Sequence, residues 1–156
     1  MEIGESKASP RLAETTSGSL DLLDGAPDAA LDELTRLASQ VCGTPMAFVS
    51  FLDDQRQWFK SRVGLDLTEA PRENSFCSQT IAQKGVFMVE DATTDARFAR
   101  HLLVTSNSRV RFYAGVPLLL SEGRRPGTLS VLDRTPRRLD ANQIQLLEVQ
   151  IGRAHV

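Results

Sequence analysis

The chain has few cysteines and no long apolar run, the features on which disulfide-rich secreted proteins and membrane proteins depend. It contains only two cysteines, Cys42 and Cys77, which lie far apart, and no apolar stretch near the N-terminus resembles a secretory signal. A disulfide framework therefore has no support, and we expect a reducing, cytoplasmic environment. No apolar run approaches the roughly 18 residues that a membrane helix requires, so no membrane association is expected.

Charge of one sign is also missing. Eighteen basic residues face twenty acidic residues, the formal net charge is -2, and no basic block is present. Nucleic acid is therefore not expected as a direct partner, because phosphate neutralisation needs clustered Lys and Arg. A length of 156 residues suits one domain with a core of its own. We expect residues 1–19 to be a flexible N-terminal segment and residues 20–156 to form a single domain.

Hydrophobic periodicity divides the remainder into helices and strands. Apolar residues at helical spacing predict a helix that starts at Asp28 and stops at Gly43. The apolar run 46–52 predicts a strand, and 57–63 predicts its hairpin partner, with Trp58 and Phe59 on opposite faces. After a loop at 64–74, a helix is predicted from Asn74 or Ser75 to Gly85. Three further strands are predicted at 86–89, 111–120 and 127–133, and the last helix starts at Asp140. The first two of these strands are joined by a long loop at 91–109, with one turn capped by Asp95.

The order of these elements favours an α+β fold. Helices and strands do not alternate as they would in a parallel, doubly wound sheet. We expect an antiparallel sheet of about 5–6 strands with helices packed on it. The last helix carries two apolar stripes, one with Leu147 and one with Leu146 and Val149, which a single sheet cannot bury together. Either a helix of another chain or the N-terminal segment covers the second stripe, and we favour the other chain.

Cys77 is the most reactive group that the sequence offers. A thiol in the first turn of a helix has its pKa lowered by the helix dipole, which favours the thiolate. The alternative is a small buried side chain, and we favour it because free cysteine is among the most buried residue types. A base for this thiol would have to come from His101, across the long loop.

Carboxylates and arginines follow in the long loop. Asp91 and Asp95 are four residues apart, but a metal site needs more oxygen ligands than this, so no metal is expected. We favour a structural role, in which Asp95 caps a turn and Arg97 or Arg111 pairs with a carboxylate. A lone histidine on a loop is usually solvated, and we expect this of His101.

The strand 111–120 places different side chains on its two faces. Tyr113 shares one face with Arg111 and Gly115, while Phe112 and its alternate neighbours occupy the other. Together with Trp58, the Tyr113 face offers the mixed polar and aromatic lining that small-molecule sites use. Gly115 can leave room for a ligand there, although a close helix contact explains a glycine equally well.

Six motifs along the chain resemble the consecutive motifs of bacterial GAF domains. They are Leu22-Leu23-Asp24-Gly25-Ala26-Pro27, Arg56-Gln57-Trp58-Phe59-Lys60-Ser61, Ser75-Phe76-Cys77, Asp91-Ala92-Thr93-Thr94-Asp95-Ala96-Arg97-Phe98, Arg111-Phe112-Tyr113-Ala114-Gly115-Val116-Pro117-Leu118 and Gly127-Thr128-Leu129-Ser130-Val131-Leu132-Asp133. They are most similar to the subtype found beside histidine kinase, PAS and diguanylate cyclase modules. The resemblance implies a PAS-related antiparallel sheet, a small-molecule pocket on one face, and terminal helices that dimerise and relay signals.

The chain departs from this family's patterns at several positions. Ser130 replaces the usual cysteine of its strand, and His101-Leu102 replaces the usual Asn-Pro. Ser78 follows Cys77, where bilin-binding members commonly have histidine. The signature of cyclic-nucleotide-binding members is not found, and the cysteines of the similar free methionine sulfoxide reductases are missing. We therefore expect no bilin, haem or metal, and the cofactor stays unknown.

The sequence thus predicts a sensory and dimerisation module of a bacterial signal-transduction protein. No complete catalytic constellation is found, and the expected partners are an unidentified small molecule, a second copy through the terminal helices, and a kinase or cyclase output domain. The alternatives are a thiol redox sensor or reductase-like enzyme that uses Cys77, and a dimerisation module with a filled, vestigial pocket. The expected ligand-binding residues are Trp58, Phe76, Cys77, Asp91, Asp95, Arg97, Phe98, Arg111, Tyr113 and Ser130.

Overall fold

A computed structural model describes residues 28–72, 75–119 and 126–154. The predicted flexible segment 1–19 and the first of the six motifs lie outside these residues, as do most of the side chains in the last turns of the C-terminal helix. Among the helices that the structure describes, none has the length and apolar character needed to cross a bilayer.

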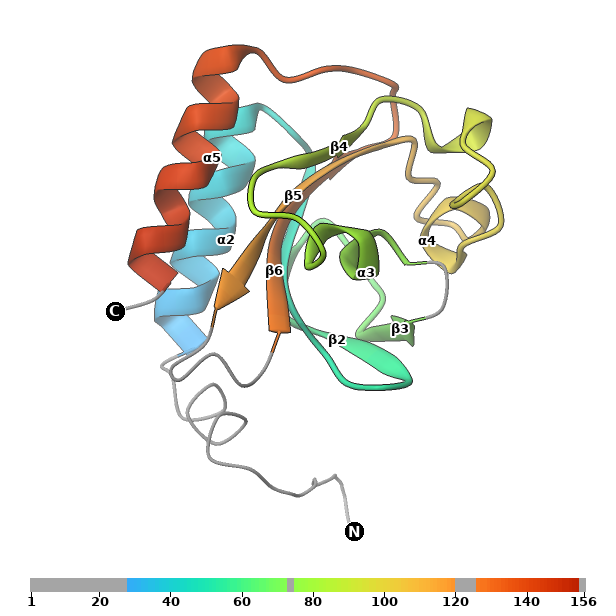
Figure 1. Cartoon of the computed structure of the whole chain (residues 1–156), viewed down its shortest axis with the longest axis horizontal. Helices are drawn as coiled ribbons and strands as arrows, with labels where there is room; N and C mark the ends of the chain where they lie inside the picture. The colour runs from blue at the N-terminus through green and yellow to red at the C-terminus, as the bar shows by residue number, and fades with distance from the viewer. Residues whose placement is uncertain (1–27, 73–74, 120–125, 155–156) are drawn as a thin grey trace, which may run out of the picture.

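A six-stranded antiparallel sheet forms the centre of the molecule (Figure 1). Its order is β3-β2-β1-β6-β5-β4, so the α+β fold is confirmed. The strands are β1 (Met46–Leu52), β2 (Arg56–Val63), β3 (Glu69–Pro71), β4 (Phe87–Val89), β5 (Phe112–Leu119) and β6 (Pro126–Asp133). Every residue of β1 is buried, because this strand lies inside the sheet and both of its faces are covered.

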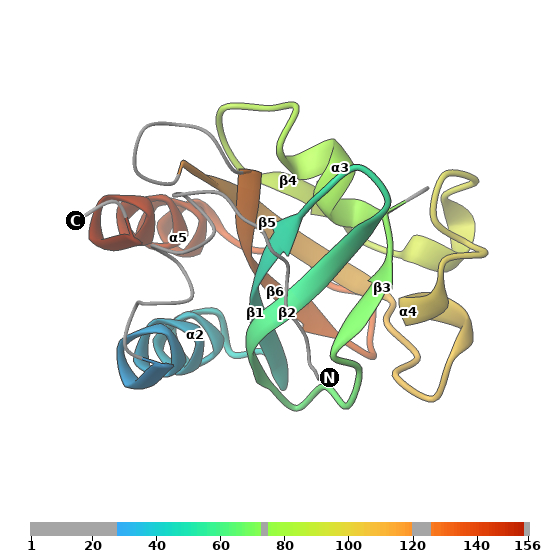
Figure 2. The same cartoon turned by 90° about the horizontal axis from the view of Figure 1, so that it is seen from below.

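Two long helices cover one face of the sheet, which we call the helix face. Helices α2 (Asp28–Cys42) and α5 (Ala141–Ala154) lie side by side in Figures 1 and 2. Their apolar sides pack onto the alternate residues of β5 and β6 that point toward them. The buried members of this cluster are Leu34, Ala38, Cys42, Ala47, Val49, Phe51, Phe112, Ala114, Val116, Leu118, Leu129, Val131, Leu139 and Leu147.

Short elements cover the opposite face. We call residues 75–111 the cover; it contains α3 (Phe76–Thr80), β4, the 3-10 helix η1 (Ala92–Thr94) and α4 (Leu102–Thr105). Tyr113 faces the cover while Phe112 faces the helices, which confirms the predicted division of β5. The two views in Figures 1 and 2 place the cover and the α2–α5 pair on opposite sides of the sheet.

Local sequence signals explain where the helices begin and end. The Asp140 carboxylate accepts a hydrogen bond from the Gln143 backbone N–H at 2.7 Å, and the Gln143 Oε1 atom accepts one from the Asp140 N–H at 3.0 Å. This reciprocal pair is a capping box. Ser75 caps α3 by accepting from the Ser78 N–H. Gly43 ends α2 with φ +65°, a conformation that glycine adopts without strain.

Three predictions about the connections were incomplete or wrong. The loop 64–74 contains β3, a three-residue edge strand that buries Ala70 and tolerates Pro71 because it lies at the sheet edge. The helix predicted to reach Gly85 ends at Thr80, since residues 82–84 are exposed and have nothing to bury. In the loop 91–109, Asp95 starts the predicted turn, but η1 and α4 were not foreseen.

Candidate functional site

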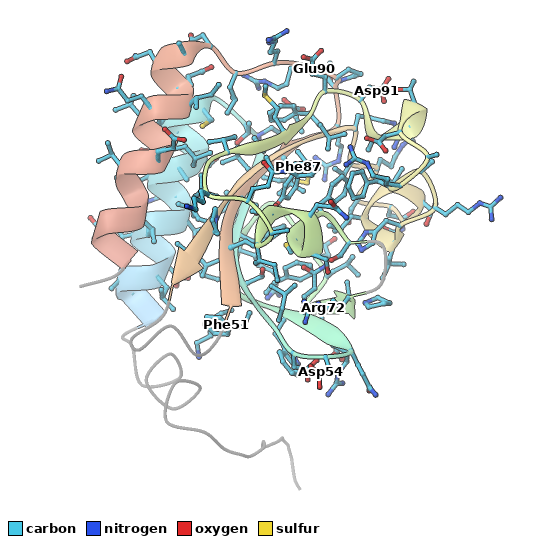
Figure 3. All side chains as sticks on the ribbon, viewed as in Figure 1. Phe51, Asp54, Arg72, Phe87, Glu90 and Asp91 are labelled. Atoms are coloured by element: carbon cyan, nitrogen blue, oxygen red, sulfur yellow. The ribbon has the colours of Figure 1, made fainter. Side chains whose placement is uncertain are left out.

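Three stacked rings lie at the centre of the cover. Phe76 of α3 stacks on Tyr113 of β5 with ring centroids 4.6 Å apart and on Phe98 at 4.5 Å. All three side chains are fully buried. Phe87 of β4 contacts Phe98 and Tyr113 of this aromatic stack, and Figure 3 shows it at β4 among crowded side chains. The stack therefore attaches α3 and the loop after β4 to the sheet.

A chain of hydroxyl groups and one thiol lies beneath the stack. The Tyr113 hydroxyl is 2.7 Å from the Ser130 hydroxyl and 2.7 Å from that of Thr80. The Ser50 and Thr128 hydroxyls are 2.7 Å apart, which continues the chain across β1 and β6. We call these groups, together with Cys77, the hydroxyl network. Each of its members is buried and hydrogen-bonded, as buried polar groups must be to avoid a large desolvation cost.

The Cys77 thiol is held inside this network. Its sulfur lies 3.2 Å from the Thr128 hydroxyl and 3.5 Å from the Ser50 hydroxyl, and the side chain has no exposed surface. Burial raises the pKa of the Cys77 thiol, and hydrogen bonds from neighbouring hydroxyls offset this only in part. The short helix α3 does not overcome this desolvation, so the thiol is neutral at physiological pH and is a packing residue.

Gly115 allows the Tyr113 hydroxyl to reach its partners. A Cβ atom at position 115 would collide with the Tyr113 hydroxyl and with the Ser130 side chain. The predicted space beside Gly115 is therefore occupied by the protein's own tyrosine. Burial raises the pKa of the Tyr113 phenol well above its usual value, so this hydroxyl remains protonated.

The amide of Gln57 lacks a hydrogen-bond partner within the part of the chain that the structure describes. Gln57 lies on β2 between Leu52 of β1 and Ala70 of β3, and its side chain is fully buried. Neither its Oε1 nor its Nε2 atom forms a hydrogen bond with these residues. An unpartnered amide in a core costs about 1–3 kcal/mol, which makes Gln57 a polar exception on the face of the sheet that the cover occupies.

Charged groups occupy the outside of the cover. Arg97 donates two hydrogen bonds to the Asp95 carboxylate, at 3.0 and 2.7 Å, and its guanidinium lies over the rings of Phe87 and Phe98. The Arg97 guanidinium lowers the pKa of the Asp95 carboxyl. The predicted pairing of Arg97 with a carboxylate and the predicted capping role of Asp95 are both confirmed, and both residues act from the surface.

His101 differs from its prediction. It is 5% exposed rather than solvated, and its ring contacts Phe76 with centroids 5.7 Å apart. Its Nδ1 atom accepts a hydrogen bond from the Leu103 N–H and so caps α4. Burial lowers the pKa of the imidazole to about 4, so His101 is neutral near pH 7. Sequence reasoning missed this because the cap belongs to a helix of only four residues.

The ten residues predicted to bind a ligand divide into two groups. Five of them meet in the aromatic stack and the hydroxyl network: Phe76, Cys77, Phe98, Tyr113 and Ser130. The other five do not line the same space. Asp95 and Arg97 form the surface pair, Asp91 caps η1, and Arg111 donates to the Val104 and Val110 carbonyls at 3.2 and 3.0 Å. Trp58 packs on the helix face, so its placement beside Tyr113 was wrong.

Sequence reasoning missed three members of the hydroxyl network. Ser50, Thr80 and Thr128 come from β1, α3 and β6, which are far apart in the chain. One signal was available: Ser50 is the only polar residue in the buried run 46–52. Among residues 28–72, 75–119 and 126–154, no group of three or more His, Cys, Asp or Glu side chains could hold a metal ion.

This architecture defines a small α+β module with a helical pair on one face of its sheet and a closed cover on the other. The GAF domain model matches residues 26–153, and the chain belongs to the GAF domain family. The resemblance inferred from the sequence motifs is thereby confirmed.

A protein named as a cyclic di-GMP phosphodiesterase from Pseudomonas aeruginosa is 47% identical over 118 residues. That match covers 76% of this chain but only 20% of the relative, so the chain spans about a fifth of the relative's length.

Solved structures share the fold at low identity. The GAF domain of an Acinetobacter phosphoenolpyruvate-protein phosphotransferase is 14% identical with a TM-score of 0.67, over 87% of this chain and 85% of that chain. A free methionine-R-sulfoxide reductase from Neisseria meningitidis is 20% identical with a TM-score of 0.58, over 87% and 84%. The GAF domain of a Bacillus halodurans sensor histidine kinase is 14% identical with a TM-score of 0.59, over 81% and 88%.

Proposed function

We propose that this chain is a non-catalytic regulatory module. It binds a small molecule at the cover and passes the resulting change through α2 and α5 to the rest of a signalling assembly. A ligand can do this only if it binds two arrangements of the module with different affinity. The relative's name supports an assembly that controls the turnover of cyclic di-GMP, and we place the module in the cytoplasm, as the sequence predicts.

The observation that carries this proposal is the state of Cys77. Catalysis by a thiol needs a thiolate, or a base that can generate one. The sulfur is fully buried, and its hydrogen-bond partners among the described residues are all hydroxyl groups. The buried imidazole of His101, with its lowered pKa, is a poor base near pH 7. The thiol thus acts as part of the core.

Contacts between α2 and the start of α5 support the relay. Arg137, which precedes α5, donates to the carbonyls of Cys42 and Gly43 at 2.9 and 2.8 Å. Gln143 of α5 donates to the Cys42 carbonyl at 3.3 Å. The end of the first helix is therefore tied to the beginning of the last one. A movement of the sheet would shift both helices together.

Alkylation of Cys77 tests the non-catalytic character. The variant Cys42→Ala leaves Cys77 as the single thiol, and its reaction with iodoacetamide is followed at pH 7 to 9, with and without urea. We expect modification at least a hundredfold slower than that of glutathione in the folded protein, and a normal rate in urea. A folded-state rate comparable to that of glutathione at pH 7 would contradict the proposal and favour a thiol redox sensor or reductase.

A second candidate function is a dimerisation module whose sheet face is permanently filled. The closed aromatic stack favours it, since Phe76, Phe98 and Tyr113 occupy the space where the sequence predicted a pocket. The two candidates differ in one respect: a filled module has no ligand to respond to, whereas a sensor is stabilised by one.

A further inference from the structure

A groove opens on the outer side of the cover, between the end of β3 and α4. Its volume is about 650 Å³, and it is lined by Pro71 and by side chains from the segment 96–105. No residue of the sheet other than Pro71 contributes to it. This groove, which we call the α4 groove, is therefore separate from the aromatic stack and the hydroxyl network.

The α4 groove is built from groups that favour an anion. Its charged lining residues are Arg97 and Arg100, and no Asp or Glu among residues 28–72, 75–119 and 126–154 lines it. The sequence from residue 96 to residue 121 contains four arginines and no acidic residue. Arg97 shares its charge with Asp95, but Arg100 is exposed and forms no ion pair or hydrogen bond with the residues that the structure describes. Its guanidinium is available for a bidentate contact with a phosphate or carboxylate.

His101 provides a second, independent indication. Because its Nδ1 atom accepts from the Leu103 N–H, the proton of the neutral ring is on Nε2. The Nε2 atom is buried and meets no hydrogen-bond acceptor at good distance and angle among the residues that the structure describes. The Pro71 backbone raises the pKa of the ring, against the larger effect of burial, but does not satisfy the Nε2–H group by these geometric criteria. An acceptor that moved the exposed Pro71 aside would satisfy it.

Apart from Thr105, the remaining lining is apolar. Ala96, Ala99 and the exposed Leu102 contribute methyl groups beside the cations. Ligand sites commonly combine such apolar walls with a few oriented polar groups. The lining therefore suits a molecule with one anionic group and a compact apolar body.

We propose that the α4 groove binds a small molecule that carries a phosphate or carboxylate group beside a compact apolar portion. The anionic group contacts the guanidinium groups of Arg97 and Arg100, and an acceptor atom receives the His101 Nε2–H. This inference names the class of ligand for the module and therefore rests on the proposed regulatory function. Binding at the loop that joins β4 to β5 would change how the cover packs on the sheet.

Titration with simple probes tests the groove. Phenyl phosphate and benzoate are added to the ¹⁵N-labelled chain, with phenol as the neutral probe, and amide shifts are followed by NMR. We expect millimolar binding of the two anions, with the largest shifts in residues 96–105 and at Arg72. Phenol should bind at least tenfold more weakly, because the charge-assisted contacts are lost.

Two variants and a control locate the contacts. Arg100→Gln removes an unpaired surface cation, and we expect it to weaken phenyl phosphate binding about tenfold. His101→Asn keeps an oxygen that can cap α4 in place of Nδ1 but lacks the Nε2–H group, and we expect a three- to tenfold loss. Arg36→Gln, an exposed change on α2, should leave the affinity unchanged.

The outcomes separate this inference from the proposed function. No binding of either anion at about 20 mM, shifts outside the groove, or unchanged affinity in both Arg100→Gln and His101→Asn would overturn the α4 groove as an anion site. If neither anion binds but a neutral molecule stabilises the chain in a ligand screen, the groove proposal fails and the regulatory function stands. The variants' melting temperatures, expected within a few degrees of the wild type, show that both are folded.

Discussion

Buried polar side chains give the covered face of the sheet its chemical character. The hydroxyl network satisfies the donors of Tyr113 and Ser130 within the core, so these residues hold α3 against β5. Fully satisfied networks make a core rigid and specify one arrangement. The exceptions are the amide of Gln57 and the Nε2 atom of His101, which are buried without partners. A rearrangement of the cover that gave these two side chains hydrogen-bond partners would therefore be stabilised by the new bonds.

Burial of His101 predicts a pH dependence of stability. Its folded pKa of about 4 lies below the ordinary value of 6.5, so the unfolded chain binds more protons between these two values. Stability is therefore full above pH 6.5 and falls as the pH drops toward 4, by about 3 kcal/mol at most. In His101→Asn, the free energy of unfolding measured in urea should lose this part of its pH dependence. Equal slopes in the variant and the wild type between pH 6.5 and 4.5 would contradict the buried, neutral state of His101.

At the scale of elements, the connection between α2 and α5 depends on Arg137. Its guanidinium donates to two carbonyls at the end of α2, pairs with Asp133 at 2.9 Å and lies over the Phe112 ring. These contacts satisfy carbonyls that have no partner within the helix. We expect Arg137→Gln to lower the free energy of unfolding by about 1–2 kcal/mol in a urea titration.

The neighbouring arginine provides the matched control. The side chain of Arg138 is 74% exposed and, among the described residues, forms an ion pair with Glu90 at 3.3 Å. Exposed ion pairs contribute little, so Arg138→Gln should change stability by less than about 0.5 kcal/mol. Similar effects of the two substitutions would show that the link between α2 and α5 is not specific to Arg137.

Elements with strong local signals could be predicted from the sequence, and those fixed by distant contacts could not. Gly43, Ser75 and Asp140 mark helix ends through their own backbone and capping chemistry, and all three were predicted. The edge strand β3 has only three residues and forms because β2 offers a free edge. Its pairing is a property of the folded sheet, and the local sequence does not encode it.

The candidate site shows the same limit. The alternation of β5 placed Tyr113 opposite Phe112 correctly. Alternation along β2 could not show which face of the sheet Trp58 occupies. It predicts that Trp58 and Phe59 point to opposite faces, but not which of the two faces the cover. The partners of Cys77 come from β1 and β6, and only the register Ser50↔Thr128 brings them together.

At the scale of the whole molecule, α5 keeps an exposed apolar surface. Leu147 is buried, whereas Leu146 and Val149 are 38% and 56% exposed, as the two apolar stripes predicted. We propose that a second copy of the chain covers this surface. The double variant Leu146→Lys/Val149→Lys should shift the chain toward monomer in analytical ultracentrifugation. Glu148→Gln, an exposed change on another side of the same helix, should not.

If the double variant self-associates as strongly as the wild type, the interface between copies does not include Leu146 and Val149. Because both side chains are exposed in the single chain, the double variant should leave the melting temperature of the monomer nearly unchanged. A large loss of monomer stability would instead indicate that these side chains pack within their own chain, for example under residues 1–27, which the structure does not describe.

The proposed regulatory module responds to a small molecule without transforming it. The most direct test is the melting temperature of the chain in the presence of nucleotides, including cyclic di-GMP, amino acids, small phosphates and carboxylates, and tetrapyrroles. We expect reproducible, saturable stabilisation by one chemical class, with the compound recovered unchanged. A well-folded chain that responds to none of them would contradict ligand sensing and leave a dimerisation module with a filled core.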